Sequence, residues 1–224
     1  MASNYFLSKV PVHSLLSRDD VRKRRTGWDI NSPTFRHRAV MGLFGEISGS
    51  PRESAGVLFR LERIPGQAPF FLVQSSVRPK DDGQVAGVET KEMEFPEYLD
   101  GQILSFSVAL NAVRRKSIEV DGKRKTRVQP IPLDHDADAL ENGETTITPW
   151  LREKLAPALD DIQLIKHLRD VLRDSGAQKS MTIQVDSFEG VAKVKDPSAL
   201  KEILTTGIGR EKAYGCGMLS VRPV

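Results

Sequence analysis

The sequence predicts an α+β protein with two tandem domains. The chain of 224 residues is long enough for two compact cores of about 100 residues each. Strand-like and helix-like segments follow the same order in both halves, and residues 96–101 resemble a linker between them. This order is that of ferredoxin-like (RRM-like) βαββαβ domains. We therefore expect one such domain in residues 1–95 and a second in residues 101–224.

The first half contains one helical pattern among short strands. The expected strands are residues 6–12, 56–63, 69–76 and 90–95. Apolar residues recur at helical spacing in residues 35–46, where Ser32 or Thr34 can cap a helix. The polar, basic stretch that precedes this helix has the composition of a loop.

The second half repeats the order and adds a hairpin. The expected strands are residues 103–113, 125–133, 180–194 and 218–221. Helices are expected to begin at Thr148-Pro149, with Thr148 as the cap, and at Asp196-Pro197. Residues 162–172 have apolar residues at helical spacing, so their periodicity alone favours a helix.

Composition excludes several classes of protein and site. No apolar run approaches the roughly 18–20 residues of a membrane span, and the N-terminus does not resemble a secretory signal. Cys216 is the single cysteine, which excludes an internal disulfide and a cysteine-based zinc site. The four histidines show no metal-ligand spacing. We expect a cytoplasmic protein with no metal, no cofactor and no membrane partner.

Positive charge is concentrated in two segments although the net charge is only +3. The cations of residues 18–38 are Arg18, Arg22, Lys23, Arg24, Arg25, Arg36 and Arg38. Those of residues 111–127 are Arg114, Arg115, Lys116, Lys123, Arg124, Lys125 and Arg127. Local clusters of this kind favour a polyanion such as nucleic acid, although two solvated loops would show the same charge runs.

His37 is the candidate for acid–base chemistry, because Arg36 and Arg38 flank it on the expected helix. An imidazole titrates near neutral pH, and neighbouring cations stabilise a phosphate in its transition state. Metal-free RNA cleavage needs a base that activates the ribose 2′-OH and an acid that protonates the leaving 5′ oxygen. A surface histidine among arginines is the simpler alternative.

A glycine-rich loop precedes the last strand in "GIGREKAYGCGMLSV", residues 207–221. Its glycines are Gly207, Gly209, Gly215 and Gly217, and Arg210 and Lys212 lie between them. These features suit a backbone that faces phosphates, or glycines that make tight turns and close packing. The loop follows a helix, so it is not a dinucleotide-binding fingerprint.

These motifs together resemble the CasE family, the repeat-processing endoribonucleases of type I-E CRISPR systems. The glycine-rich segment resembles the C-terminal signature of that family, and "YFLSKVPV" resembles its opening strand. In "HRAVMGLF", His37 falls where the family has its active-site histidine. The resemblance covers nearly the whole chain and is strongest in residues 1–18, 35–44 and 184–224.

The resemblance implies two ferredoxin-like domains and metal-independent cleavage of precursor CRISPR RNA at the base of a repeat stem-loop. It also implies that the product stays bound in the Cascade complex with the other Cascade subunits. The corresponding region after the first helix of the second domain is a strand in the family, so we expect residues 162–172 to be a strand. The family's RNA-binding hairpin corresponds to residues 114–127. We also expect the glycine-rich loop to bring its backbone close to RNA or to the first domain, with Gly207, Gly209, Arg210 and Lys212 as its candidate RNA contacts.

One position departs from the family pattern. Some members carry a tyrosine one helical turn before the histidine, where this chain has Thr34. Support for His37 is therefore expected from Lys212, Arg22 or Thr34, or is not needed. A non-catalytic RNA-binding scaffold is the main alternative function. An RRM-like binder of single strands is disfavoured because no run of the required aromatic motif occurs.

Overall fold

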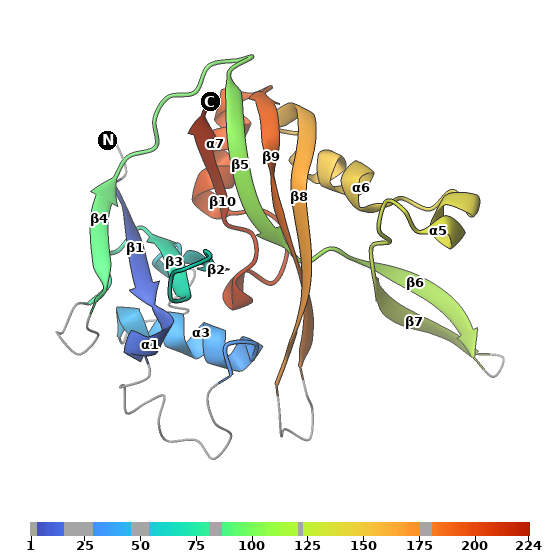
Figure 1. Ribbon diagram of the computed structural model, residues 1–224, viewed down its shortest axis with the longest axis horizontal. Coiled ribbons are helices and arrows are strands. Elements are labelled where there is room, and N and C mark those ends of the chain that lie inside the picture. Colours follow the sequence, from blue (N-terminus) through green and yellow to red (C-terminus); the bar gives the residue numbers. More distant parts are fainter. Residues whose placement is uncertain (1–3, 16–28, 46–53, 81–86, 121–122, 175–180) are drawn as a thin grey trace.

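The computed structural model describes residues 4–15, 29–45, 54–80, 87–120, 123–174 and 181–224 (Figure 1). For three residues within these ranges, Ile118, Val120 and Lys123, the backbone is described but the side chain is not. Among the described residues, no helix is long and apolar enough to cross a membrane.

The first half forms a four-stranded antiparallel sheet in the order β2-β3-β1-β4. Its strands are β1 (Tyr5–Pro11), β2 (Leu58–Glu62), β3 (Phe70–Ser75) and β4 (Glu89–Met93). Its helices are α1 (Val12–Leu15), α3 (Pro33–Met41) and η1 (Gly42–Phe44). The core contains Phe59 and Phe71 from the sheet and Val40 and Phe44 from the helical segment.

The second half repeats this strand order as β10-β5-β9-β8. Its strands are β5 (Ile103–Leu110), β8 (Leu159–Arg173), β9 (Thr182–Val194) and β10 (Leu219–Pro223). Its helices are α5 (Ala137–Glu141), α6 (Ile147–Leu155), α7 (Pro197–Thr206) and η2 (Lys212–Tyr214). Leu104 and Phe188 of the sheet pack with Leu151 of α6 and Leu200 of α7 in its core.

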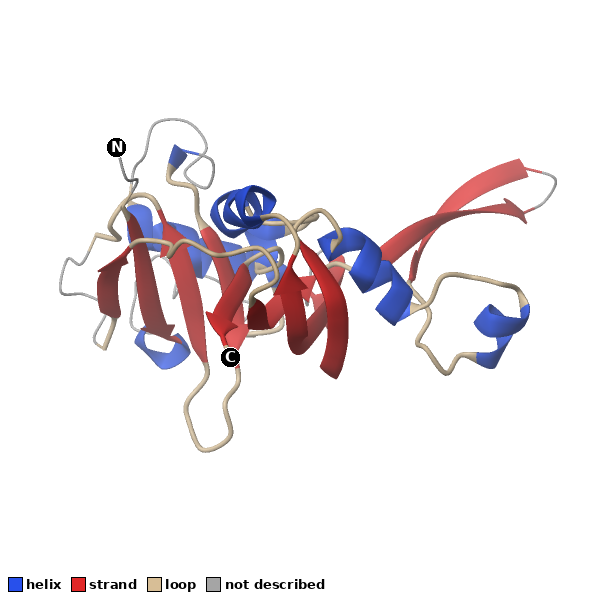
Figure 2. Ribbon diagram, turned by 90° about the horizontal axis from the view of Figure 1, so that it is seen from above, coloured by secondary structure: helices blue, strands red, loops and turns tan. Residues whose placement is uncertain are grey.

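A two-stranded hairpin is inserted between β5 and α5. It consists of β6 (Val113–Val120) and β7 (Lys123–Pro130), which pair only with each other among the described strands. The hairpin projects beyond both sheets (Figure 2). Both faces of the hairpin therefore lie away from the two cores, which is the arrangement expected for a basic hairpin that binds RNA.

β8 is a strand in spite of its helical periodicity. It pairs with β9 from Leu159 to Arg173, with register irregularities at Asp160/Gln163 and Leu164/Lys166. Ile165 and Leu168 lie on this edge strand with 73% and 57% of their surfaces exposed. The apolar spacing therefore reflects bulges and exposed edge positions rather than one buried helical face.

The expected cap of α6 was wrong. The helix begins at Ile147, and Thr146 occupies the cap position without a capping side-chain hydrogen bond. Thr148 lies inside the first turn, where its hydroxyl and N–H donate to Asp134 at 2.5 and 3.0 Å. The Asp134 carboxylate, rather than Thr148, thus satisfies the open start of the helix. In α3, by contrast, Ser32 is the cap, and its hydroxyl accepts from the N–H of Phe35.

The two sheets are joined by buried polar contacts. Arg60 of β2 is 8% exposed, and its Nη1 donates to the Ser220 hydroxyl of β10 at 2.7 Å. Gln74 of β3 is 2% exposed and donates to the carbonyl of Leu204 in α7 at 2.7 Å. Phe95 contacts Tyr5 of β1 and also packs on the second core. Each half is therefore fixed against the other.

Candidate functional site

His37 lies where α3 meets the glycine-rich loop of the second half. Its Nδ1 is 3.1 Å from the carbonyl oxygen of Ala213, and its ring centroid is 5.9 Å from that of Tyr214. A carbonyl oxygen only accepts hydrogen bonds, so we infer that Nδ1 carries a proton. In the neutral ring, Nε2 then holds the free lone pair and is the nitrogen that can accept a proton.

The N-terminus of α3 is held by the second sheet. Asp174, just beyond β8, accepts hydrogen bonds from the hydroxyls of Ser32 and Thr34 and from the Thr34 N–H. Burial would raise the pKa of Asp174, but these hydrogen bonds outweigh burial and lower that pKa below its ordinary value. The Arg173 N–H also donates to the Asn31 carbonyl. Thr34 therefore acts here in placing the helix that carries His37.

Arg36 was expected to contact RNA, and its burial contradicts this. Arg36 is only 3% exposed, and its Nε donates to the Ile30 carbonyl at 2.7 Å. Burial, and then repulsion from Arg63, lower its pKa to about 10. Residues two positions apart on a helix point to different sides, so Arg36 of α3 points inward while Arg38 is exposed. Arg38 thus remains available to an external phosphate.

The glycine-rich loop packs on β2 of the first sheet. Gly207 has a φ of 72°, and a Cβ there would lie 2.6 Å from Leu58. Gly215 has a φ of 98°, and a Cβ there would lie 3.2 Å from the Phe59 ring. Gly207 is buried, so the expectation that it contacts RNA is wrong. Gly209, in contrast, is exposed.

Lys212 closes the loop on itself. Its ammonium group donates to the carbonyls of Thr206 and Gly207 at 2.8 and 2.9 Å. These carbonyls lie at the C-terminal end of α7, where a cation is favourable. Lys212 therefore shapes the loop whose Ala213 carbonyl contacts His37, while Arg210 is exposed.

Buried Cys216 lies behind this loop. It packs in a small cluster with Leu172 and Val185 of the second sheet and with Tyr214. Burial raises the pKa of its thiol to about 12, so the thiol is neutral near pH 7. Cys216 is therefore a packing residue of the loop and supplies no nucleophile.

The hairpin divides its cations between two faces. The strand register places Arg114, Lys116, Lys125 and Arg127 on one face. Near the foot of the hairpin, Arg114 and Lys116 pair with Glu144. The hydrogen bond from Lys116, followed by that from Arg114, lowers the pKa of this carboxyl group.

The opposite face of the hairpin carries Arg115 and Arg124. Both are exposed. The side chain of Lys123 and the residues Arg22, Lys23, Arg24 and Arg25 lie outside the described residues. The hairpin can therefore offer cations to RNA on both sides of its ribbon.

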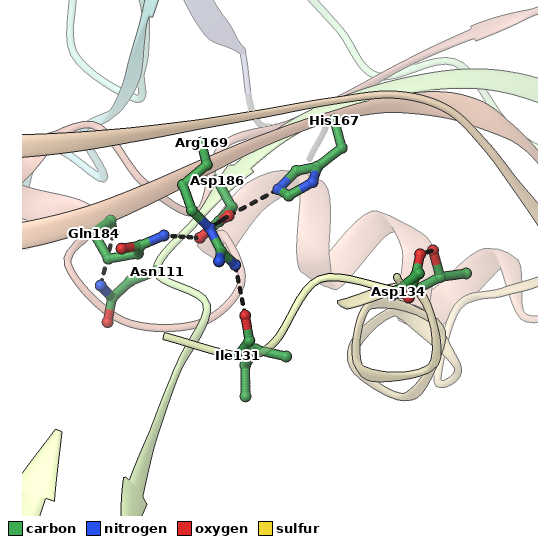
Figure 3. A network of polar contacts seen from close by, with 8 residues as sticks. Asn111, Ile131, Asp134, His167, Arg169, Gln184 and Asp186 are labelled. Carbon is green, nitrogen blue, oxygen red and sulfur yellow. Dashed lines mark hydrogen bonds and ion pairs between the residues drawn. The ribbon is translucent and has the colours of Figure 1, made fainter. Parts of the chain in front are cut away.

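A buried polar network holds the foot of the hairpin (Figure 3). Asp186 of β9 is fully buried and accepts from Arg169 Nε at 2.7 Å and from His167 Nε2 at 2.8 Å. Arg169 also donates to the Ile131 carbonyl at the end of β7. The Asn111 side chain, just before β6, donates to the Gln184 carbonyl. Both ends of the hairpin are thus tied to β8 and β9.

Two features of the site escaped the sequence reasoning. Tyr214 and the Ala213 carbonyl lie more than 170 residues from His37 along the chain. The signal in the sequence for Tyr214 is an aromatic residue within a glycine-rich loop, beside the glycines and cations that mark the loop. Among the described residues, no cluster of three or more potential metal-ligating His, Cys, Asp or Glu side chains occurs.

Comparison with known proteins identifies the family. The model of the family described as "CRISPR associated protein" matches residues 6–223. The chain belongs to this family. The match covers almost the whole chain, and the strand order of both sheets is that of tandem ferredoxin-like folds. The fold class expected from the sequence is therefore confirmed.

Curated members of the family include two relatives that are each 29% identical. One is the CRISPR system Cascade subunit CasE of Escherichia coli, aligned over 82% of this chain and 89% of its own length. The other is the CRISPR-associated endoribonuclease Cse3 of Thermus thermophilus, aligned over 87% and 92%. These matches confirm the resemblance to the CasE family.

A solved structure of the family extends the comparison to the fold. The structure of CRISPR endoribonuclease Cse3 bound to a 19-nucleotide RNA is similar, with a TM-score of 0.63 and 26% identity. The similarity covers 98% of this chain and 99% of that chain. The two-sheet architecture is thus shared over the full length.

Proposed function

We propose that this protein is a metal-independent endoribonuclease that cleaves precursor CRISPR RNA within each repeat, at the base of a stem-loop. The proposed reaction is attack of a ribose 2′-OH on the adjacent phosphate. It leaves a 2′,3′-cyclic phosphate or 3′-phosphate and a 5′-hydroxyl. The mature RNA would stay bound in Cascade. The names of the two curated relatives, a Cascade subunit and a CRISPR-associated endoribonuclease, support an endoribonuclease that acts in Cascade.

The observation that carries the proposal is the contact between His37 Nδ1 and the Ala213 carbonyl. It orients the imidazole and leaves Nε2 to exchange a proton with RNA. As a base, neutral His37 takes the proton from the 2′-OH; as an acid, the protonated ring gives one to the 5′ oxygen. Positioned proton transfer of this kind contributes about 10²–10⁴-fold to rate.

Support for His37 would come from the loop and from the helix cap. Tyr214 supplies the phenol that the sequence lacks one turn before the histidine, and its ring lies beside the imidazole. Thr34 and Lys212 act as positioning residues, since their polar groups bind Asp174 and the loop carbonyls. Arg22 keeps the supporting role expected from the sequence.

RNA would be held by the exposed cations near His37 and by both faces of the hairpin. We assign phosphate contacts to Arg38, Gly209, Arg210, Arg114, Arg115, Lys116, Lys123, Arg124, Lys125 and Arg127, and to Lys23, Arg24 and Arg25 of the preceding loop. An A-form stem has a deep, narrow major groove, so such contacts read mostly shape and backbone. The similar structure of Cse3 bound to a 19-nucleotide RNA supports RNA as the ligand.

We propose residues 1–95 and 101–224 as the two domains.

The test is single-turnover cleavage of a labelled repeat RNA in buffer with chelator. His37→Ala should abolish cleavage and leave RNA binding intact, while His135→Ala, an exposed histidine of the second half, should cleave like the wild type. A repeat with a 2′-deoxynucleotide at the cut should resist cleavage. If the wild type binds the repeat without cutting it, the protein is a non-catalytic RNA-binding scaffold.

A further inference from the structure

A cavity of about 500 Å³ lies at the foot of the hairpin, on the face opposite Glu144. Its polar and aromatic lining comes from β6, α6, the glycine-rich loop and the turn after β5. The residues are Asn111, Arg115, Trp150, Lys154, Gly209 and Arg210. Ligand pockets of about 300–1,000 Å³ hold small organic molecules, so the cavity has room for more than a single ion.

The charge of the cavity is one-sided. Arg115, Lys154 and Arg210 reach it from three separate elements, and no carboxylate of the described chain lines it. Within the described ranges no acidic side chain pairs with Arg115 or Arg210, and the Lys154 ammonium is 3.9 Å from Glu153. Like charges that converge in this way repel one another, and a bound anion relieves the repulsion.

Trp150 adds an aromatic surface to these cations. It is half-buried, its ring centroid is 6.4 Å from that of Phe188, and the Lys154 ammonium lies 5.8 Å from the ring centroid. A tryptophan fixed against the core in this way can stack a nucleic-acid base, and such stacking tolerates any base. A ring beside several cations matches a nucleotide, which joins a flat base to a phosphate.

We propose that this cavity binds one unpaired nucleotide of the RNA strand, with its phosphate at Arg115, Lys154 and Arg210 and its base on Trp150. The inference rests on the proposed function. Arg210 lies on the same loop as Ala213, which contacts His37, so the nucleotide belongs to the strand that is cut. The aromatic ring and the adjoining basic hairpin favour RNA over an acidic peptide.

The experiment titrates adenosine 5′-monophosphate into a Trp28→Phe background, in which Trp150 is the single tryptophan. The proposal expects saturable quenching of Trp150 fluorescence. Lys154→Gln and Arg210→Gln should each weaken binding by about tenfold, as expected for loss of one charge-assisted hydrogen bond. Lys166→Gln is the matched control, because its exposed ammonium pairs with Glu189 away from the cavity, and it should bind as the background does.

Three outcomes would overturn the proposal: no saturable quenching, equal weakening in Lys166→Gln, or quenching by a hexaglutamate peptide but not by the mononucleotide. Circular dichroism of each variant shows that it is folded. The titration needs no cleavage. A protein that binds the mononucleotide and does not cut repeat RNA would therefore disprove the proposed nuclease alone, whereas one that cuts without such binding would disprove the cavity proposal alone.

Discussion

Replacement of Asp186 by alanine should destabilise the second half strongly, because it removes the acceptor of a buried ionic network. Asp186 is fully buried, and the side chain of its partner Arg169 is only 24% exposed. Removal of one partner of a buried pair costs about 3–5 kcal/mol, since the remaining charge stays uncompensated. At about 2–4 °C per kcal/mol for a chain of this size, the midpoint of thermal unfolding should fall by about 6–20 °C.

The matched control is Asp170→Ala on the neighbouring strand. Asp170 pairs with Arg63 at 2.9 Å, but the two side chains are 46% and 48% exposed. Such exposed pairs contribute about 0.2–1 kcal/mol. Urea unfolding of both variants, followed by circular dichroism, gives the two losses in free energy of unfolding. Equal losses in the two variants would refute the role assigned to the network.

Three further predictions concern helix α3 and the glycine-rich loop. Tyr214→Phe should lower the cleavage rate about tenfold or more without change in RNA affinity, if the phenol supports proton transfer; an unchanged single-turnover rate would remove Tyr214 from the mechanism. Asp174→Asn should destabilise the protein near pH 7, because the carboxylate of Asp174 is stabilised in the folded state and its pKa is lowered there. The difference from the wild type should begin to shrink below the ordinary aspartate pKa of about 3.9 and be lost as pH falls through the lowered folded-state pKa, and a difference that persists at lower pH would contradict this. Buried Cys216, with its pKa raised to about 12, should react with Ellman's reagent only after denaturation, and rapid labelling of the native protein would contradict the packing described.

Strands and helices could be predicted from the sequence wherever the local pattern and the tertiary packing favour the same structure. Ser32 and Pro33 begin α3, and Asp196 caps α7, as their residue types predict. β8 was different, because bulges and exposed edge residues gave a strand the apolar spacing of a helix. Only the family resemblance corrected that expectation.

The site was predictable only in part, since its contacts join distant segments. His37 could be chosen from its neighbours in sequence, but the Ala213 carbonyl that orients it comes from the other half of the chain. The same limit explains the errors at Arg36 and Gly207. A charge run does not show which arginine points inward, and a glycine motif does not show which glycine packs on β2.

The end groups of the cleaved RNA test the central claim most directly. Wild-type protein is incubated with a labelled repeat RNA in excess chelator, beside His37→Ala, and the products are mapped and their termini identified. The account predicts one cut at the base of the stem, a 2′,3′-cyclic phosphate or 3′-phosphate with a 5′-hydroxyl, and no cut with His37→Ala. Cleavage by His37→Ala at the wild-type rate, or loss of wild-type cleavage in chelator, would contradict it.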